Sequence, residues 1–75
     1  MEPSTIDAVR ATYGSRADEA LALLERYGDE PWHREVDRVR RAVLTLAAGD
    51  LDKLRLRVET ARRDYRDVLF NAEYR

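Results

Sequence analysis

The chain's one histidine, His33, stands in the stretch ERYGDEPWHREVDRVR (residues 25–40), beside its one tryptophan and among several carboxylates. His33 and Asp37 are four residues apart, a spacing that places two side chains on one face of a helix. An imidazole close to carboxylates can relay a proton or help to hold a divalent cation. A working site would need further groups from elsewhere in the fold.

Two more carboxylates approach His33 if the helices before and after Gly49 lie antiparallel. Counting about 1.5 Å per residue from that joint places Asp64 and Asp67 level with His33. Zinc sites normally use several His or Cys ligands, whereas this chain has one histidine and no cysteine. The acids are also interspersed with arginines, so a solvated ion-pair face is the favoured interpretation and a metal or acid–base site the alternative.

No other catalytic set can be assembled from these residues. With one histidine and no cysteine, neither a Ser–His–Asp nor a Cys–His arrangement is available. The three glycines are isolated from one another, so no glycine-rich loop could cradle a phosphate. We therefore predict no catalytic residues, no metal site, no cofactor and no small-molecule substrate.

The elements that position these residues are predicted to be helices. Each glycine is followed directly by a residue suited to the start of a helix, in the pairs Gly14–Ser15, Gly28–Asp29 and Gly49–Asp50. Pro31 suits the first turn of a helix, where its missing N–H does no harm. The short loops at 28–30 and 49–50 favour antiparallel packing of consecutive helices.

Apolar residues recur at helical spacing through most of the chain. The most regular series predicts one amphipathic helix roughly 36 Å long, with apolar positions at Leu51, Leu54, Val58, Ala61, Tyr65, Val68 and Ala72. The preceding helix shows Trp32, Val36, Val39, Val43 and Leu46. A shorter one shows Ala17, Ala20, Leu21, Leu24 and Tyr27. An N-terminal helical turn or two carries Ile6, Val9 and Tyr13, with Ser4 as a possible cap.

These patterns predict an all-α fold in one domain, residues 1–75. Residues 15–75 would form a small antiparallel three-helix bundle with a long C-terminal helix, preceded by an N-terminal helical arm, residues 1–14. The predicted core comprises Tyr27, Trp32, Val36, Val39, Val43, Leu54, Val58 and Tyr65. Trp32 would lie in an aromatic cluster with Tyr27 and Tyr65, or else stay partly exposed as an anchor for a partner protein.

Composition narrows the class of protein further. The 75 residues are 44% hydrophobic, enough for one small core. Charged residues make up 39%, yet the net charge is −1, which argues against a strong nonspecific binder of polyanions. Thirteen of the fourteen basic residues are arginine, which we attribute to a high-GC bacterial genome. No apolar run resembles a signal peptide or a membrane span, so a cytoplasmic protein is expected.

Two segments, YGDEPWHREVDRVRRAVLTLAAGDLDKL and RRDYRDVLFNAEYR, resemble a group of small uncharacterised bacterial proteins. The shared features are a Tyr-Gly-x-Glu-like helix joint, a Gly-Asp/Asn-Leu joint and an Asp-Tyr-Arg-Asp-Val-Leu run near the end. The resemblance covers roughly Leu23 to Tyr74 and implies a helical domain of unknown function.

Apolar residues away from the core positions point to an interface. Leu44, Leu56 and Phe70 fall outside the main apolar seams, which favours a homodimer or a helical protein partner. The N-terminal arm could instead cover this strip and leave a monomer. The alternative function is weak nucleic-acid binding through arginines of the second and third helices, namely Arg34, Arg38, Arg41, Arg55, Arg62 and Arg66.

Overall fold

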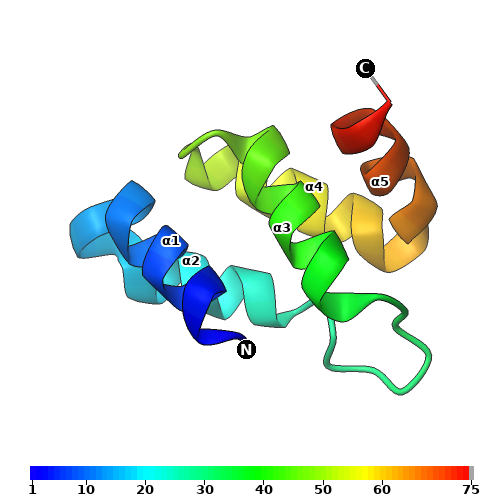
Figure 1. The fold of residues 1–75 in the computed structure, drawn as a ribbon, viewed down its shortest axis with the longest axis horizontal. Helices are drawn as coiled ribbons and strands as arrows, with labels where there is room; N and C mark the ends of the chain where they lie inside the picture. Colours follow the sequence, from blue (N-terminus) through cyan, green and yellow to red (C-terminus); the bar gives the residue numbers. More distant parts are fainter. Residues whose placement is uncertain (75) are drawn as a thin grey trace.

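The computed structural model describes residues 1–74, and these residues fold into helices joined by turns and one longer loop (Figure 1). The elements in chain order are α1 (Pro3–Tyr13), the 3₁₀ turn η1 (Gly14–Arg16), α2 (Ala17–Glu25), α3 (Val36–Ala47), α4 (Leu51–Arg63) and α5 (Tyr65–Glu73). Residues 1–74 contain no strand, so the predicted all-α class is confirmed.

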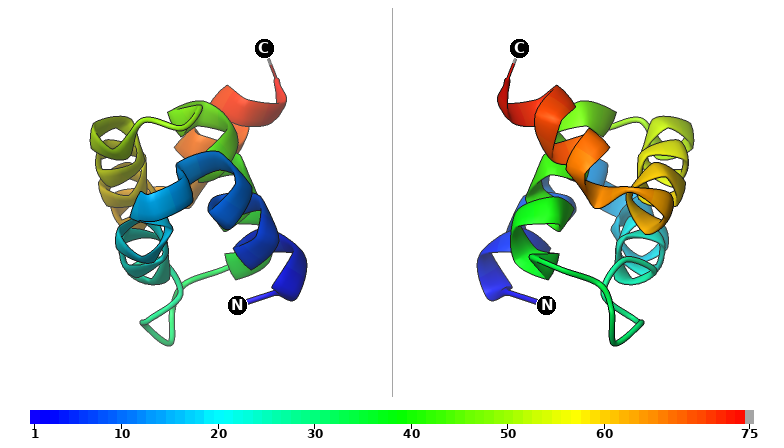
Figure 2. Two further views of the ribbon diagram at one scale, coloured as in Figure 1. Left: turned by 90° about the vertical axis from the view of Figure 1, so that its left-hand side faces the viewer. Right: turned by 90° about the vertical axis from the view of Figure 1, so that its right-hand side faces the viewer.

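Helix α4 is at the centre of the packing, because it contacts α2, α3 and α5. Its buried face carries Leu54, Val58 and Ala61, which meet the other helices in one continuous apolar core. The helices cross one another instead of lying along a common axis (Figures 1 and 2). Of the predicted regular antiparallel three-helix bundle, only the helical content and the short joint at Gly49 agree with the structure.

The prediction of one long C-terminal helix is wrong. Helix α4 ends at Arg63, and the backbone of Asp64 is extended (φ −155°, ψ 93°). The side-chain carboxylate of Asp64 accepts a hydrogen bond from the N–H of Arg66 and so caps α5. This corner turns α5 back onto α3, where Val68 and Leu69 are buried. A straight helix of roughly 36 Å would exceed the largest extent of the molecule, 30 Å, and leave its end without a core.

The second predicted helix starts later than expected. Helix α3 begins at Val36, and residues 26–35 form a loop that projects from one side of the molecule (Figures 1 and 2). Pro31 is therefore in a loop, and Asp29 caps no helix. Trp32 is 66% exposed, which contradicts its predicted place in the core. Of the other predicted core residues, Val36 and Tyr65 are half-buried, and the rest are buried: Tyr27, Val39, Val43, Leu54 and Val58.

The predicted helix starts have mixed outcomes. Asp50 is confirmed as the N-cap of α4, since its carboxylate accepts a hydrogen bond from the N–H of Lys53 (3.0 Å). Ser4 and Ser15 cap nothing: α1 starts at Pro3, which tolerates the first helical position because it lacks an N–H, and Ser15 lies inside η1.

The N-terminal arm is a regular helix of 11 residues that packs against α2 and the edge of α3. Val9 and Tyr13 are buried and belong to the same core cluster as α4. The arm is therefore an integral part of the core. Among the described residues, no helix combines the length and apolar content needed to cross a membrane.

Candidate functional site

The loop 26–35, which connects α2 to α3, is held by two aromatic side chains. The buried hydroxyl of Tyr27 donates a hydrogen bond to the carbonyl of Arg34 (2.8 Å) and accepts one from the N–H of the same residue (3.2 Å). One side chain thus satisfies both backbone groups of a residue seven positions later. These bonds fasten the end of the loop to its beginning.

His33 provides the second fastening. Its Nδ1 accepts a hydrogen bond from the N–H of Gly28 (2.8 Å) and a longer one from the N–H of Glu30 (3.4 Å). The imidazole stacks on the ring of Tyr27 with centroids 4.4 Å apart, and its side chain is only 4% exposed. Because Nδ1 is an acceptor, the ring in this arrangement is neutral and carries its proton on Nε2.

The predicted cluster of His33 with Asp37, Asp64 and Asp67 does not form. His33 precedes α3, so it shares no helical face with Asp37. Its nearest carboxylate is that of Asp29, whose Oδ1 is 3.7 Å from Nδ1. Within residues 1–74, no three His, Cys, Asp or Glu side chains are placed to hold a metal ion.

Two guanidinium groups secure the start of the loop from the helices behind it. The Nε of Arg40, a buried residue of α3, donates to the carbonyl of Tyr27 (2.9 Å). Arg62 of α4 donates to the carbonyl of Arg26 and to the carboxylate of Asp29 (2.9 Å). The loop is therefore tied to α3 and α4 as well as to itself.

The sequence reasoning missed the role of Arg40. A signal was present, because Arg40 has the spacing of the apolar positions Val36, Val43 and Ala47 and so falls on the buried face of α3. An arginine at such a position must find acceptors inside the fold, since an unpaired buried charge is costly. The acceptor that it finds is a loop carbonyl.

Burial raises the pKa of the Tyr27 hydroxyl, because the phenolate would be poorly solvated there. The hydrogen bond with the backbone of Arg34 opposes this shift, and burial prevails. Tyr27 therefore stays protonated well into alkaline solution, which preserves its hydrogen bonds to the loop.

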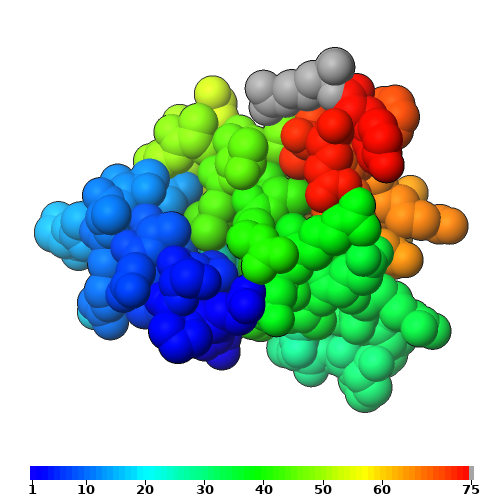
Figure 3. Space-filling view, viewed as in Figure 1, coloured from blue at the N-terminus to red at the C-terminus, as the bar shows by residue number. Residues whose placement is uncertain are grey.

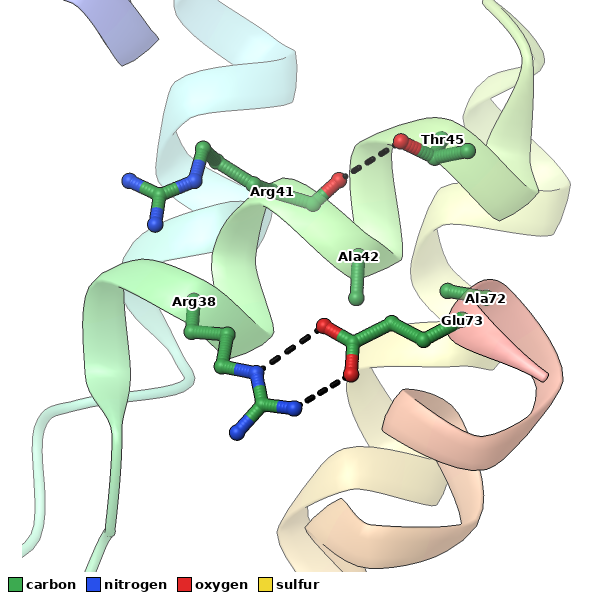
Figure 4. A pocket seen from close by; sticks show the side chains of 6 residues that line it. All are labelled: Arg38, Arg41, Ala42, Thr45, Ala72 and Glu73. Carbon is green, nitrogen blue, oxygen red and sulfur yellow. Dashed lines mark hydrogen bonds and ion pairs between the residues drawn. The ribbon is translucent and has the colours of Figure 1, made fainter.

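The arginines predicted to contact nucleic acid are mostly committed to intramolecular ion pairs. Arg38 forms a two-pronged pair with Glu73 (Figure 4), which lowers the pKa of that carboxyl, and it also contacts Glu35. The other pairs are Arg41–Glu2, Arg55–Asp52, Arg62–Asp29 and Arg66–Asp64, the last at 3.5 Å. Arg34 is an exposed residue of the loop. The six do not form one uninterrupted basic stripe.

Two shallow grooves flank α3. The groove between α3 and α5 has a volume of about 340 Å³ and is lined by Arg38, Arg41, Ala42, Thr45, Ala72 and Glu73 (Figure 4). The groove between α1 and α3, about 290 Å³, is lined by Ser4, Thr5, Ala8, Arg41, Leu44 and Thr45. Helices α1, α3 and α5 appear together on one face of the molecule (Figure 3). Leu44 is half-buried in the second groove, so the N-terminal helix covers part of this predicted interface residue.

The other two predicted interface residues are exposed. Leu56 on α4 and Phe70 on α5 are each 61% exposed. Phe70 stacks on Tyr74, one helical turn later, with ring centroids 5.7 Å apart, and Tyr74 is also largely exposed. The sequence reasoning did not include Tyr74, although its i,i+4 spacing from Phe70 was available as a signal.

Comparisons with known proteins identify no relative of this chain. No family model, curated protein or solved structure matches it.

Proposed function

We propose that this protein is a non-enzymatic helical interaction module that associates with a second copy of itself through the outer face of α5. The observation that carries the proposal is the stacked pair Phe70–Tyr74, two largely exposed aromatic side chains at the end of α5. Aromatic residues that project from a rigid helix are typical anchors of protein interfaces.

A second copy suits this face because its side chains are self-complementary. Arg66 and Phe70 of α5 and Tyr74, the residue directly after this helix, are spaced four residues apart and form one stripe. If two α5 helices pair antiparallel about a two-fold axis at Phe70, Arg66 lies opposite Tyr74 of the second copy. The side chain of Arg66 is 80% exposed and only loosely paired with Asp64, so it is available for a cation–π contact.

The charges beside the stripe are compatible with such pairing. In this register Asp67 lies opposite Glu73 of the second copy, which would bring two acids together. Glu73 is already paired with Arg38 of its own chain, so much of its charge is compensated. A chain of 75 residues also builds only a modest core, and association is a common way for small domains to gain stability.

Sedimentation equilibrium over a range of concentrations tests the proposal. The wild-type protein is expected to show a mass that rises toward that of a dimer, because apolar surface is buried on association. Phe70→Glu is expected to give a monomer at every concentration, since it places a charge at the centre of the contact. Leu56→Glu is the matched control: it is equally exposed but lies on α4, and it should leave dimerisation unchanged.

A wild-type protein that stays monomeric at high concentration would refute the proposal. Loss of dimer in Leu56→Glu but not in Phe70→Glu would assign the interface to α4 instead of α5. Within the proposed geometry, Arg66→Glu should weaken the dimer by roughly thirtyfold, because the two-fold axis repeats a contact worth about 1 kcal/mol and both copies of it are lost.

A further inference from the structure

We propose that His33 is a pH-operated latch: its protonation releases the loop 26–35 and Trp32 while the helical core stays folded. This inference concerns a different part of the molecule from the outer face of α5 and does not depend on self-association. It rests on the hydrogen bonds, stacking and burial of His33.

The latch follows from which ring atom faces the backbone. Nδ1 of His33 accepts the N–H of Gly28 at 2.8 Å, with the N–H of Glu30 also directed at it. A proton on Nδ1 replaces the acceptor with a donor, so two N–H groups would then face each other across that distance. The hydrogen bond to Gly28 cannot survive this change.

A protonated ring has another partner within reach. The carboxylate Oδ1 of Asp29 is 3.7 Å from Nδ1. In the neutral ring both atoms are acceptors and cannot bond, but the carboxylate is close enough to attract an imidazolium. Turning Nδ1 toward Asp29 means leaving Gly28. The two protonation states of His33 therefore select two different bonding partners, which is the requirement for a switch.

The charges from the surrounding helices do not hold the imidazolium in its present place. Asp29 attracts it, but that carboxylate is shared with Arg62 of α4. The guanidinium of Arg40 from α3 lies against Gly28 and disfavours a second positive charge there. The remaining titratable and charged groups of the loop and its neighbours are Arg26 with its partner Glu59 of α4, Tyr27, Glu30, Arg34, Glu35 and, from α5, Tyr65.

Release of the latch would alter how the protein displays Trp32. This indole and the His33 ring form a T-shaped pair with centroids 6.0 Å apart, and the indole is otherwise largely exposed. In the neutral state the stacked His33 and Tyr27 rings give Trp32 a fixed support. The core residues Leu24, Val39 and Leu54 are fully buried between the helices, so opening of the loop need not unfold them.

Amide hydrogen exchange measured by NMR tests the latch directly. In the wild-type protein, the protection factor of the Gly28 amide is expected to fall at least about tenfold between pH of about 7.5 and about 5. The protection factor of the Leu54 amide serves as the internal reference for the core and should not fall with it. Factors corrected for intrinsic exchange are needed, because exchange itself depends on pH.

Two variants separate the latch from other effects of acid. His33→Asn keeps an acceptor oxygen near the position of Nδ1 but does not titrate, so Gly28 should be protected equally at both pH values. His33→Ala removes the acceptor, so Gly28 should be poorly protected at both. If the alanine variant fails to fold, the wild-type and asparagine proteins still decide the question.

The proposal is overturned if Gly28 remains equally protected in the wild type once the ring-proton chemical shifts show His33 to be charged. It is also overturned if His33→Asn loses protection in acid as the wild type does, because another group would then be responsible. Parallel loss of protection at Gly28 and Leu54 would indicate global unfolding and would likewise exclude a local latch.

Discussion

The two connections that flank α3 are held in their conformations in different ways. The turn 48–50 between α3 and α4 is short: Ala48 and Gly49 adopt positive φ, and Asp50 caps the next helix. The loop 26–35 between α2 and α3 is long, and side chains from its own residues, from α3 and from α4 hold it in place. The first connection is determined locally and the second by contacts across the fold.

A connection's tolerance to substitution depends on whether its own neighbouring residues or contacts across the fold determine its conformation. In the turn 48–50, a change affects one backbone dihedral angle or one cap. In the loop 26–35, Tyr27, His33 and Arg40 bond the backbone at several points, so a change at one point releases others. The loop should therefore be the more sensitive of the two connections.

The largest difference in the free energy of unfolding is expected between Gly28→Ala in the loop and Gly49→Ala in the turn. Gly28 has φ +110°, and an added Cβ would lie 2.6 Å from both a methyl carbon of Val36 and the Arg40 guanidinium. Gly28→Ala should lower the free energy of unfolding by about 3 kcal/mol through strain and overpacking. Gly49→Ala, where φ is +84° and the nearest atom is a Thr12 carbon at 3.3 Å, should cost about 1 kcal/mol. Urea denaturation measures both, and equal losses would contradict the comparison.

A smaller effect is expected from removing one hydroxyl in the loop. Tyr27→Phe leaves the N–H and carbonyl of Arg34 without their partner and should cost about 1–2 kcal/mol at neutral pH, measured by urea denaturation. Tyr13→Phe is a useful comparison, since it removes a buried hydroxyl outside the loop.

Tyr27→Phe should also change how the free energy of unfolding responds to alkaline pH. Burial raises the pKa of Tyr27 above its ordinary value of 10.0, so the folded state favours the protonated phenol. Its contribution to stability is complete below that value and is lost as the pH rises through and beyond it. Tyr27→Phe should therefore lose less stability above pH 10 than the wild type, with a residual loss from Tyr13, whose pKa is also raised by burial. An unchanged alkaline profile would argue against this account.

The smallest effect is expected in the turn. Asp50→Ala removes the side-chain cap of α4 and should cost about 1 kcal/mol, as measured by thermal or urea unfolding. Asp52→Ala is the matched control, because this acid lies two residues later with a nearly fully exposed side chain and caps no helix. A loss larger than that for Tyr27→Phe would remove the distinction between the two connections.

The features that could be predicted from the sequence are those that neighbouring residues determine. The all-α class, the joint at Gly49 and the Asp50 cap follow from preferences of neighbouring residues, and the sequence was sufficient for them. At Gly28 it was sufficient only for the presence of a break between two helices. The start of α3 was misplaced because Asp29 and Pro31 have the right types for a helix start. What overrides them is the bonding of Tyr27 and His33, which spans residues that only the folded chain brings together.

The corner at Asp64 was missed for another reason. The 3-4 spacing of apolar residues continues from α4 into α5 because both helices face the same core, so periodicity alone contains no sign of the break. The candidate site at His33 failed with the same helix assignment, since its geometry assumed that His33 lay on α3. The stretch does join two helices, as the favoured interpretation had it, but Tyr27 and His33 hold it as a loop, and no helix starts at Asp29.

The corner at Asp64 also has a consequence for how two chains could exchange parts. A single extended residue connects α4 to α5, and α5 packs on α3 with Val68 and Leu69 buried. If that residue adopted helical dihedral angles, α4 and α5 would form one continuous helix. Helix α5 would then leave its own α3 and could occupy the same place on a neighbouring molecule. Asp64 is thus the natural hinge for domain swapping, and an alanine there, which loses the cap and favours a continuous helix, is the substitution most suited to promote it.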